Sequence, residues 1–189
     1  MNKLNYMIAF CLFSMNGIYA QKAVTDPVRK VSQGAEKPQK EYVISGKITQ
    51  THSYCGGAAP SEEMLKACET PVPYKGKTLY VRVGNGNSLK QPILLKFAAD
   101  AAGNFSFKLK PGVYSIIQPE QVKELDWKQL RAGDAVQVDQ ECVKAWWKKP
   151  YYVLNVKDKN IETLSFNFYH PCFVSSDVPC LQYVGPMPP

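Results

Sequence analysis

The chain has 189 residues, of which 23 are Lys or Arg and 16 are Asp or Glu, so its formal net charge at pH 7 is +7. The basic residues are scattered among acidic ones, and without a basic face or a recognition motif this composition argues against nucleic-acid binding. With 45% hydrophobic residues, eleven Tyr and eight Phe, the chain can fill the core of one domain, and its aromatic content favours strands.

The first twenty residues have the layout of a secretory signal peptide. A single Lys3 precedes an apolar run from Tyr6 to Met15, and small or neutral residues follow up to Ala20. The run is shorter than the ~20 residues that a membrane-spanning helix needs. We therefore expect cleavage after Ala20, export to the periplasm or beyond it, and no membrane span in the mature chain. Residues 21–41 are polar without apolar periodicity, which predicts a flexible leader.

Alternation of apolar and polar residues predicts seven strands between residues 42 and 170. In the fourth of them, for example, Phe105, Phe107 and Leu109 share one face. The predicted strands are 42–50, 78–84, 92–100, 105–110, 113–118, 151–157 and 161–170. A mainly-β sandwich follows from this pattern.

Two helices are predicted between the fifth and sixth strands. Apolar residues at helical intervals, such as Val122 and Leu130, predict a helix over 119–133, and VDQECVKAWWKKP predicts a second short one. Together they make a helical insertion at 119–149. A further turn or two of helix is expected after Pro60, beginning at Ser61.

Residues 42–169 resemble the prealbumin-like domains of secreted bacterial proteins, also called carboxypeptidase-regulatory-like or collagen-adhesin B-type repeats. The resemblance is carried by SGKI, by the run from Asp100 to Ile116 and by LSFNF. It implies a seven-stranded Greek-key β-sandwich. With SYCGGA and the terminal PCLQYVGPMPP, the whole layout is also similar to small exported proteins of Bacteroidetes-type bacteria. The resemblance implies a fold and a compartment, and no reaction.

Five cysteines and both histidines are expected at one pole of the sandwich. If each connection reverses the chain, strands one, five and seven all end at the pole from which the segments with these residues leave. Export favours disulfides over free thiols. We predict a bridge between Cys172 and Cys180 that staples the tail, residues 170–189, and a second between Cys55 and Cys142, with Cys68 as the free thiol.

An alternative use of this pole is a zinc or copper site, or a thiol-reactive site. It would use His52, Cys55, His170 and Cys172, because imidazole and thiolate are ligands for both metals. The short spacings C-x₂-C and H-x₃-H, which are typical of structural zinc sites, are missing. The disulfide interpretation is therefore preferred.

Four aromatic residues lie close together at the end of the insertion: Trp146, Trp147, Tyr151 and Tyr152. They are either a binding platform for a sugar ring or peptide, or packing residues of the core, and core packing is the preferred interpretation.

No motif for catalysis is present, since G-x-S-x-G, H-E-x-x-H and a paired-carboxylate pattern are all missing. The sequence thus predicts a non-enzyme without a cofactor: an exported, disulfide-stabilised monomer with a binding or structural role at the cell envelope. Its expected partner is an envelope protein or a glycan.

Overall fold

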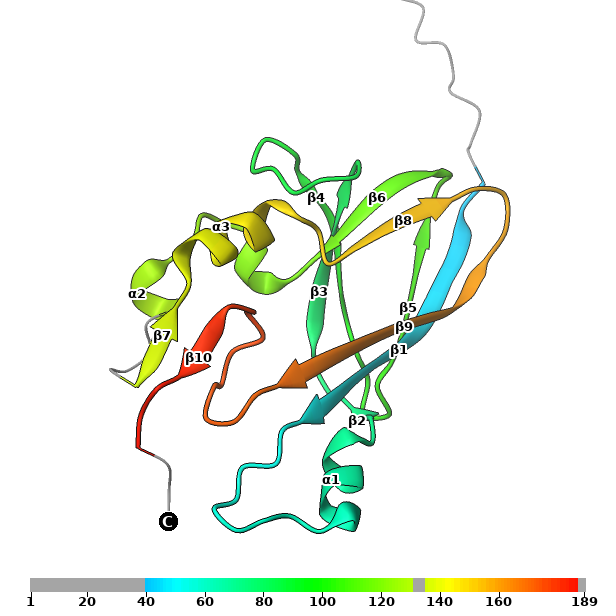
Figure 1. Ribbon diagram of the computed structural model, residues 1–189. Coiled ribbons are helices and arrows are strands. Elements are labelled where there is room, and N and C mark those ends of the chain that lie inside the picture. The colour runs from blue at the N-terminus through cyan, green and yellow to red at the C-terminus, as the bar shows by residue number, and fades with distance from the viewer. Residues whose placement is uncertain (1–39, 131–134, 187–189) are drawn as a thin grey trace, which may run out of the picture. The chain divides into compact units, whose positions relative to one another are not determined.

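The computed structural model describes residues 40–130 and 135–186. The predicted signal peptide lies outside the described residues, as does the predicted leader except for Lys40 and Glu41. The described part is mainly β, with two four-stranded sheets and one two-stranded sheet (Figure 1). Among these residues, no helix has the length and apolar character needed to cross a membrane.

The first four-stranded sheet is built around its longest strand, β1. On one side β1 pairs antiparallel with β5 and with the short β2, and on the other it pairs in parallel with β9. The members of this sheet are β1 (Tyr42–His52), β2 (Val72–Pro73), β5 (Asn104–Leu109) and β9 (Ile161–His170).

The second four-stranded sheet is antiparallel throughout, in the order β4-β3-β6-β8. Its members are β3 (Thr78–Val83), β4 (Ile93–Ala98), β6 (Gly112–Ile117) and β8 (Tyr152–Val156). Each of the seven segments predicted as strands overlaps one of these strands, whereas β2 was not predicted.

The main core lies between the two four-stranded sheets. Ile44 and Ile48 of β1 are fully buried, as are Leu79 and Val81 of β3. Full burial of such an aliphatic side chain contributes about 1.5–3 kcal/mol. Aromatic rings extend this core, with Phe105 stacked 5.6 Å from Phe166 between ring centroids. Alternation therefore places the apolar faces of both sheets inside, as predicted.

The helices α1 and α3 begin at capping side chains that the sequence supplies. Ser61 accepts a hydrogen bond from Met64 N at the start of α1 (Glu62–Glu69), and Asp139 accepts one from Cys142 N at the start of α3 (Gln140–Lys148). Such caps stabilise a helix by about 1 kcal/mol. Both helices lie where the sequence predicted them.

The continuous helix predicted over 119–133 is wrong. The described residues instead form a 3₁₀ turn, η1 (Pro119–Gln121), and a single α-helical turn, α2 (Trp127–Leu130). The Val122 carbonyl would accept from Asp126 N in a helix, but it accepts a hydrogen bond of 2.9 Å from the buried Arg82 guanidinium. At the end of the first turn the carbonyl of Val122 is thus bonded to a side chain from the second sheet.

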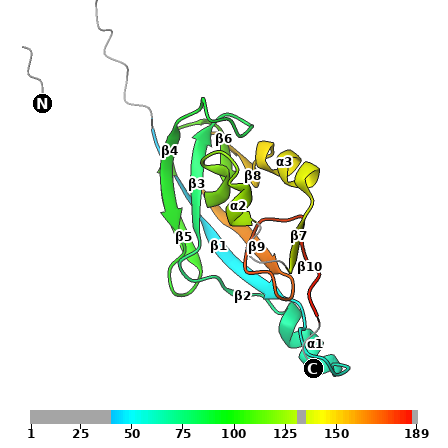
Figure 2. The same ribbon diagram turned by 90° about the vertical axis from the view of Figure 1, so that its left-hand side faces the viewer.

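A second, smaller core joins the insertion to the C-terminal tail. The strands β7 (Val136–Val138) and β10 (Leu181–Tyr183) form an antiparallel pair. Together with α2 and α3 they lie beside the sandwich, while α1 projects near β2 (Figures 1 and 2). The buried side chains of this second core are Leu130, Val143, Val174, Val178 and Leu181.

Candidate functional site

Two disulfides fix the C-terminal segment to the rest of the described chain. Cys55 is bridged to Cys172 with a Cα–Cα distance of 5.4 Å, and Cys142 is bridged to Cys180 with a distance of 5.9 Å. These are the four cysteines expected in bridges, and Cys68 on α1 is unpaired among the described cysteines. The predicted pairing of Cys172 with Cys180 and of Cys55 with Cys142 is wrong.

The observed pairing follows from strand neighbours that the sequence did not reveal. The strands β1 and β9 are parallel neighbours that end in register, His52 opposite His170, so the segments leaving them bring Cys55 and Cys172 together. The strand β10 pairs with β7, which directly precedes α3, and the carbonyl of Cys180 accepts a hydrogen bond from Asp139 N. Cys180 is thereby placed beside Cys142 in the first turn of α3.

The residues of the alternative metal site pair with each other in a way that leaves no thiolate ligand. The rings of His52 and His170 are stacked with centroids 5.0 Å apart, but the sulfurs of Cys55 and Cys172 are bonded to each other and supply no thiolate. No group of three or more His, Cys, Asp or Glu among the described residues could hold a metal ion.

We call residues 172–180, which run between the two bridged cysteines, the anchored loop. Its first end is tethered to the segment after β1 and its second end to α3. Phe173 and Cys180 have positive φ angles of 60° and 70°, a conformation that is uncommon for residues other than glycine and that persists only where the surroundings impose it. The loop is therefore held in one shape at both ends.

A buried ion pair fastens the middle of the anchored loop to the sandwich. Lys77 Nζ contacts Asp177 Oδ2, and the two side chains are only 6% and 7% exposed. The Tyr74 hydroxyl donates a 3.0 Å hydrogen bond to the same carboxylate oxygen, and Lys77 Nζ lies 4.4 Å above the Phe168 ring. An ion pair and a hydrogen bond thus converge on Asp177, and the cation–π contact with Phe168 holds Lys77 beside it.

Burial and this carboxylate change the acidity of two neighbours. Burial, together with the charge and hydrogen bond of Asp177, raises the pKa of Tyr74 to about 12, so Tyr74 remains a hydrogen-bond donor at neutral pH. Burial lowers the pKa of His170, although the charge of Asp177 opposes this shift. His170 Nε2 lies 3.4 Å from Asp177 Oδ1, but among the described residues neither atom has a hydrogen-bond partner.

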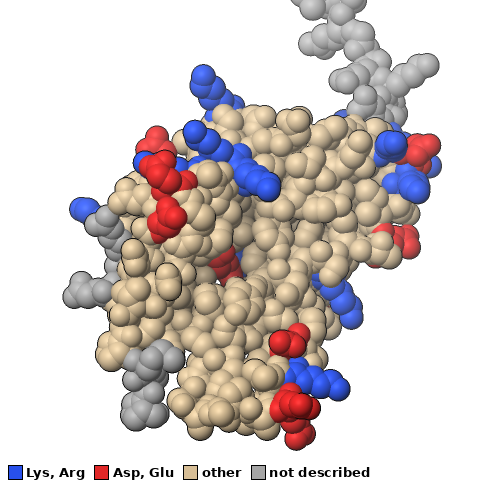
Figure 3. All heavy atoms as spheres, in the orientation of Figure 1, with Lys and Arg blue, Asp and Glu red and all other residues tan. Residues whose placement is uncertain are grey.

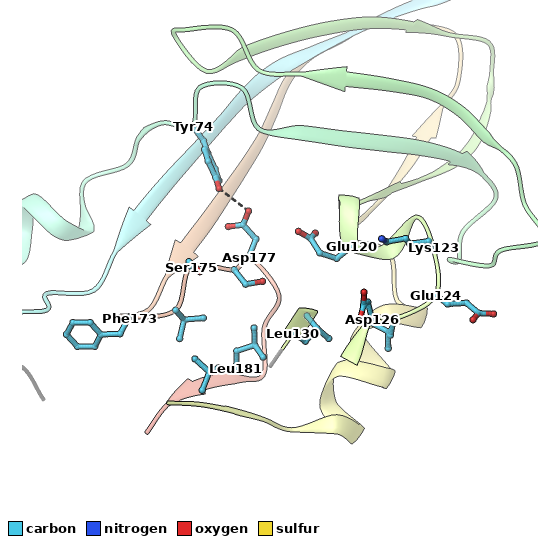
Figure 4. Close-up of a pocket in the computed structure, with 14 residues that line it drawn as sticks. Tyr74, Glu120, Lys123, Glu124, Asp126, Leu130, Phe173, Ser175, Asp177 and Leu181 are labelled. Carbon is cyan, nitrogen blue, oxygen red and sulfur yellow. Dashed lines mark hydrogen bonds between the residues drawn. The ribbon is translucent and has the colours of Figure 1, made fainter. Parts of the chain in front are cut away.

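A first cavity, of about 510 Å³, lies between the anchored loop and the segment that contains η1 and α2 (Figure 4). Tyr74 and Asp177 are joined by their hydrogen bond at its wall. Glu120 also lines it, and the buried Oε2 of this residue accepts no hydrogen bond from the described part of the chain. Polar groups therefore line this cavity together with apolar residues such as Leu130 and Phe173.

A second cavity, of about 440 Å³, is also lined by Asp177, which the two cavities share. Aromatic side chains from α3, β9 and the residue before β8 line it together with Gln118 and the second half of the anchored loop. Its lining includes Gln118, Trp146, Tyr151, Phe168, Asp177 and Val178. Both volumes are within the range of small-molecule sites, about 300–1,000 Å³.

The four aromatic residues, for which core packing was preferred over a binding platform, lie in different surroundings. Trp146 packs against the second core and Tyr151 stacks on Phe168 with centroids 4.8 Å apart, and these two line the second cavity. Trp147 is half-buried and its indole N–H donates to the Lys123 carbonyl. Tyr152 is exposed. Two of the four residues thus share a concave surface.

Three polar residues of the site were not found from the sequence: Lys77, Asp177 and Gln118. Lys77 precedes a strand and Asp177 lies in SSDVP, where both look like solvated turn residues. The one available signal was the position of Asp177 between two cysteines.

On the face drawn in Figure 3, basic and acidic side chains are interspersed on a largely uncharged surface, with acidic atoms in a central recess.

No protein-family model matches the chain, and no curated protein is significantly similar to it. Two solved structures share a partial likeness at 12% identity. The Bacillus anthracis TIE protein gives a TM-score of 0.30 over 68% of this chain and 16% of its own. A 9R-lipoxygenase from Cyanothece PCC8801 gives 0.26 over 80% of this chain and 18% of its own. The chain spans less than a fifth of the length of either structure.

Proposed function

We propose that this protein is an exported, disulfide-stabilised β-sandwich module that binds a ligand at the cell envelope without catalysing a reaction. The observation that carries this proposal is the anchored loop. Two disulfides hold its ends, and its residues line both cavities. A binding surface that is fixed before the ligand arrives loses less conformational entropy on binding, which increases affinity.

Two features support the exported compartment. Disulfides persist in the periplasm and outside the cell, whereas cytosolic thiols are kept reduced, and the described residues contain two of them. The first twenty residues have the pattern of a signal peptide that is cleaved after Ala20. We include in the proposal that the mature protein is a monomer of the periplasm or the cell exterior.

The finer description of the fold is also part of this proposal. A prealbumin-like Greek key of seven strands would use β1, β3, β4, β5, β6, β8 and β9. The helical insertion, residues 119–149, would then be an addition that supplies α3 to the second cavity and β7 to the pair with β10.

Envelope binding can be tested with the full chain expressed in a Bacteroidetes-type host. We expect the protein in the periplasmic or extracellular fraction, with Gln21 as the first residue by mass spectrometry. We further expect the purified protein to sediment with isolated cell envelopes.

A matched pair of variants connects envelope binding to the anchored loop. The double variant Cys142→Ala/Cys180→Ala releases one end of the loop and should reduce sedimentation with envelopes at least fivefold. Cys68→Ala leaves both bridges in place and should bind like the natural protein. The proposal is wrong if the natural protein stays in the supernatant, or if the double variant keeps its β-sheet circular dichroism and binds equally well.

A further inference from the structure

The loop between β3 and β4 contains an asparagine followed by a glycine, Asn85 and Gly86. Asn85 is exposed, and a Cβ atom added at Gly86 would meet nothing within 4 Å. Among the described residues, none accepts a hydrogen bond from the Gly86 N–H, and none bonds to the Asn85 side chain. The side-chain carbonyl carbon of Asn85 and the backbone nitrogen that follows it are therefore both open to reaction.

Glycine is the residue that hinders a reaction between these two atoms least. A side chain at position 86 would crowd the approach of the nitrogen to Asn85 Cγ and would restrict the backbone angles that the approach needs. Gly86 does not have a positive φ angle, so alanine can replace it without backbone strain. The hindrance can thus be added while the fold is kept.

Asn87, two residues further on, has the same amide group in the opposite surroundings. It is 8% exposed, and its Nδ2 donates to the carbonyl of Gln121 at 3.0 Å and to that of Trp147 at 2.8 Å. Loss of this amide nitrogen would take the donor away from both carbonyls and leave a carboxylate beside them. Packing and hydrogen bonds therefore protect Asn87, whereas they do not protect Asn85.

The Asn85–Gly86 pair lies between two points at which the loop is fastened. Before the pair, the Gly84 N–H donates to the Val113 carbonyl at 2.8 Å. After it, the Asn87 N–H donates to the Lys148 carbonyl at 3.2 Å. A backbone atom added between these two points has to displace one of them.

The second of these points holds the C-terminal end of α3. The last carbonyls of a helix have no partner within the helix, and in α3 those of Trp147 and Lys148 accept from the side chain and the backbone of Asn87. Displacement of Asn87 removes two of the hydrogen bonds that hold this end. Because Trp146 of the same turn lines the second cavity, the effect reaches the wall of that cavity.

We infer that Asn85 is a site of spontaneous deamidation, with water as the co-reactant, and that the isoaspartate formed there loosens the end of α3. The nitrogen of Gly86 bonds to Asn85 Cγ and closes a succinimide ring, while the Cγ–Nδ2 bond breaks. The amide nitrogen leaves as ammonia and takes the proton of the Gly86 N–H with it.

Water then opens the ring between the Gly86 nitrogen and the main-chain carbonyl carbon of Asn85. Its hydroxyl completes a new carboxylate on that carbon, and its proton returns to the nitrogen. The chain now continues through Cγ and is longer by one carbon, about 1.5 Å. This is the added backbone atom that the two fastened points cannot both accommodate.

The test uses the purified mature protein, incubated at pH 6 and at pH 8 and then digested with trypsin. The peptide Val83–Lys90 contains both Asn85 and Asn87, and tandem mass spectrometry locates the replacement of an amide by a carboxyl group within it. We expect Asn85 to be converted, and faster at pH 8, because the attacking nitrogen has to lose its proton. An isoaspartyl methyltransferase should label the product, and Asn87 should stay intact.

Two variants connect the reaction to its effect on α3. Gly86→Ala should be converted slower by about tenfold or more, because its Cβ hinders the attack. In hydrogen exchange, the incubated natural protein should exchange faster in the last turn of α3 than fresh protein does, whereas incubated Gly86→Ala should not. Asn85→Asp supplies the new charge without the added carbon and should exchange like the fresh protein. If Gly86→Ala does not fold, Asn85→Gln replaces it, because a Gln side chain has to close a larger ring.

Three results would overturn the site: Asn85 intact after incubation at pH 8, conversion of Gly86→Ala at the natural rate, or conversion of Asn85 with unchanged exchange in α3. Faster exchange of α3 in Asn85→Asp would assign the effect to the charge and would contradict the role of the longer backbone.

Discussion

Lys77 and Asp177 are one hundred residues apart in the sequence and form a buried ion pair. The pair joins the residue before β3 to the middle of the anchored loop. Removing one partner of such a pair leaves an uncompensated charge in the protein interior, which costs more than the pair contributes when intact.

We expect Lys77→Met to lower the free energy of unfolding by about 3–5 kcal/mol, measured by urea denaturation. The double variant Lys77→Met/Asp177→Leu should lose less unfolding free energy than Lys77→Met, because it leaves no unpaired charge of this pair in the interior. Lys144 and Glu141 form an exposed pair, and Lys144→Met should cost no more than about 1 kcal/mol. Equal losses in the two single variants would show that burial of the pair is unimportant.

His170 makes the stability of the protein depend on pH. Its pKa is lowered by burial and by the charges of Lys77 and His52, while Asp177 raises it. The folded state therefore favours the neutral imidazole. The contribution of His170 is complete above the unfolded pKa, about 6.5, and declines as the pH falls below that value towards the lowered pKa of the folded state.

His170→Gln should reduce the loss of unfolding free energy between pH 7 and pH 5, measured by urea denaturation at each pH. His52→Gln is the matched control, because it removes the stacked neighbour and leaves His170 in place. It should keep most of the acid-dependent loss. Equal pH dependence in His170→Gln and the natural protein would contradict the assignment.

The strands were predictable from local information, because a half-buried strand must alternate. Phe105 and Leu109 are buried on the predicted face of β5, and the insertion helix α3 begins at the capping residue Asp139. The continuous helix predicted over 119–133 was wrong, and within this segment a distant side chain, Arg82, donates to the carbonyl of Val122. A periodicity argument contains no information on such a long-range contact.

The cysteine pairing could not be predicted because it depends on which strands are neighbours. The expectation that β1 and β9 end at the same pole is correct, since they are parallel and in register at His52 and His170. The sequence did not show that they are directly adjacent, and adjacency decides that Cys55 reaches Cys172. Asp177 was missed for the same reason, since its buried partner Lys77 lies one hundred residues away, just before β3.

The two disulfides should differ in their effect on global and local stability. By the chain-entropy model, a bridge across 117 residues contributes about 4.9 kcal/mol and one across 38 residues about 3.9 kcal/mol. Cys55→Ala/Cys172→Ala should therefore lower the free energy of unfolding slightly more than Cys142→Ala/Cys180→Ala.

Hydrogen exchange distinguishes the two bridges more sharply. Loss of the Cys142–Cys180 bridge should increase exchange in α3 and β10, because these elements share the second core. Loss of the Cys55–Cys172 bridge should instead increase exchange in the first half of the anchored loop. The same exchange pattern in both double variants would contradict separate roles for the bridges.

Gly46 of β1 lies against the backbone of β9 and leaves no room for a side chain. A Cβ atom there would lie 1.9 Å from the Leu164 carbonyl oxygen, next to the register shift between Ile44 and Gly46. Backbone atoms cannot turn away as a side chain can, so Gly46→Ala must separate the two strands. We expect a loss of about 1–3 kcal/mol, as for overpacked cores, measured by urea denaturation. Gly86→Ala, where an added Cβ meets nothing within 4 Å, should change stability by less than about 0.5 kcal/mol.

Because β1 and β9 end beside the Cys55–Cys172 bridge, Gly46→Ala should also make that bridge easier to reduce, and a wild-type rate of reduction would contradict the coupling.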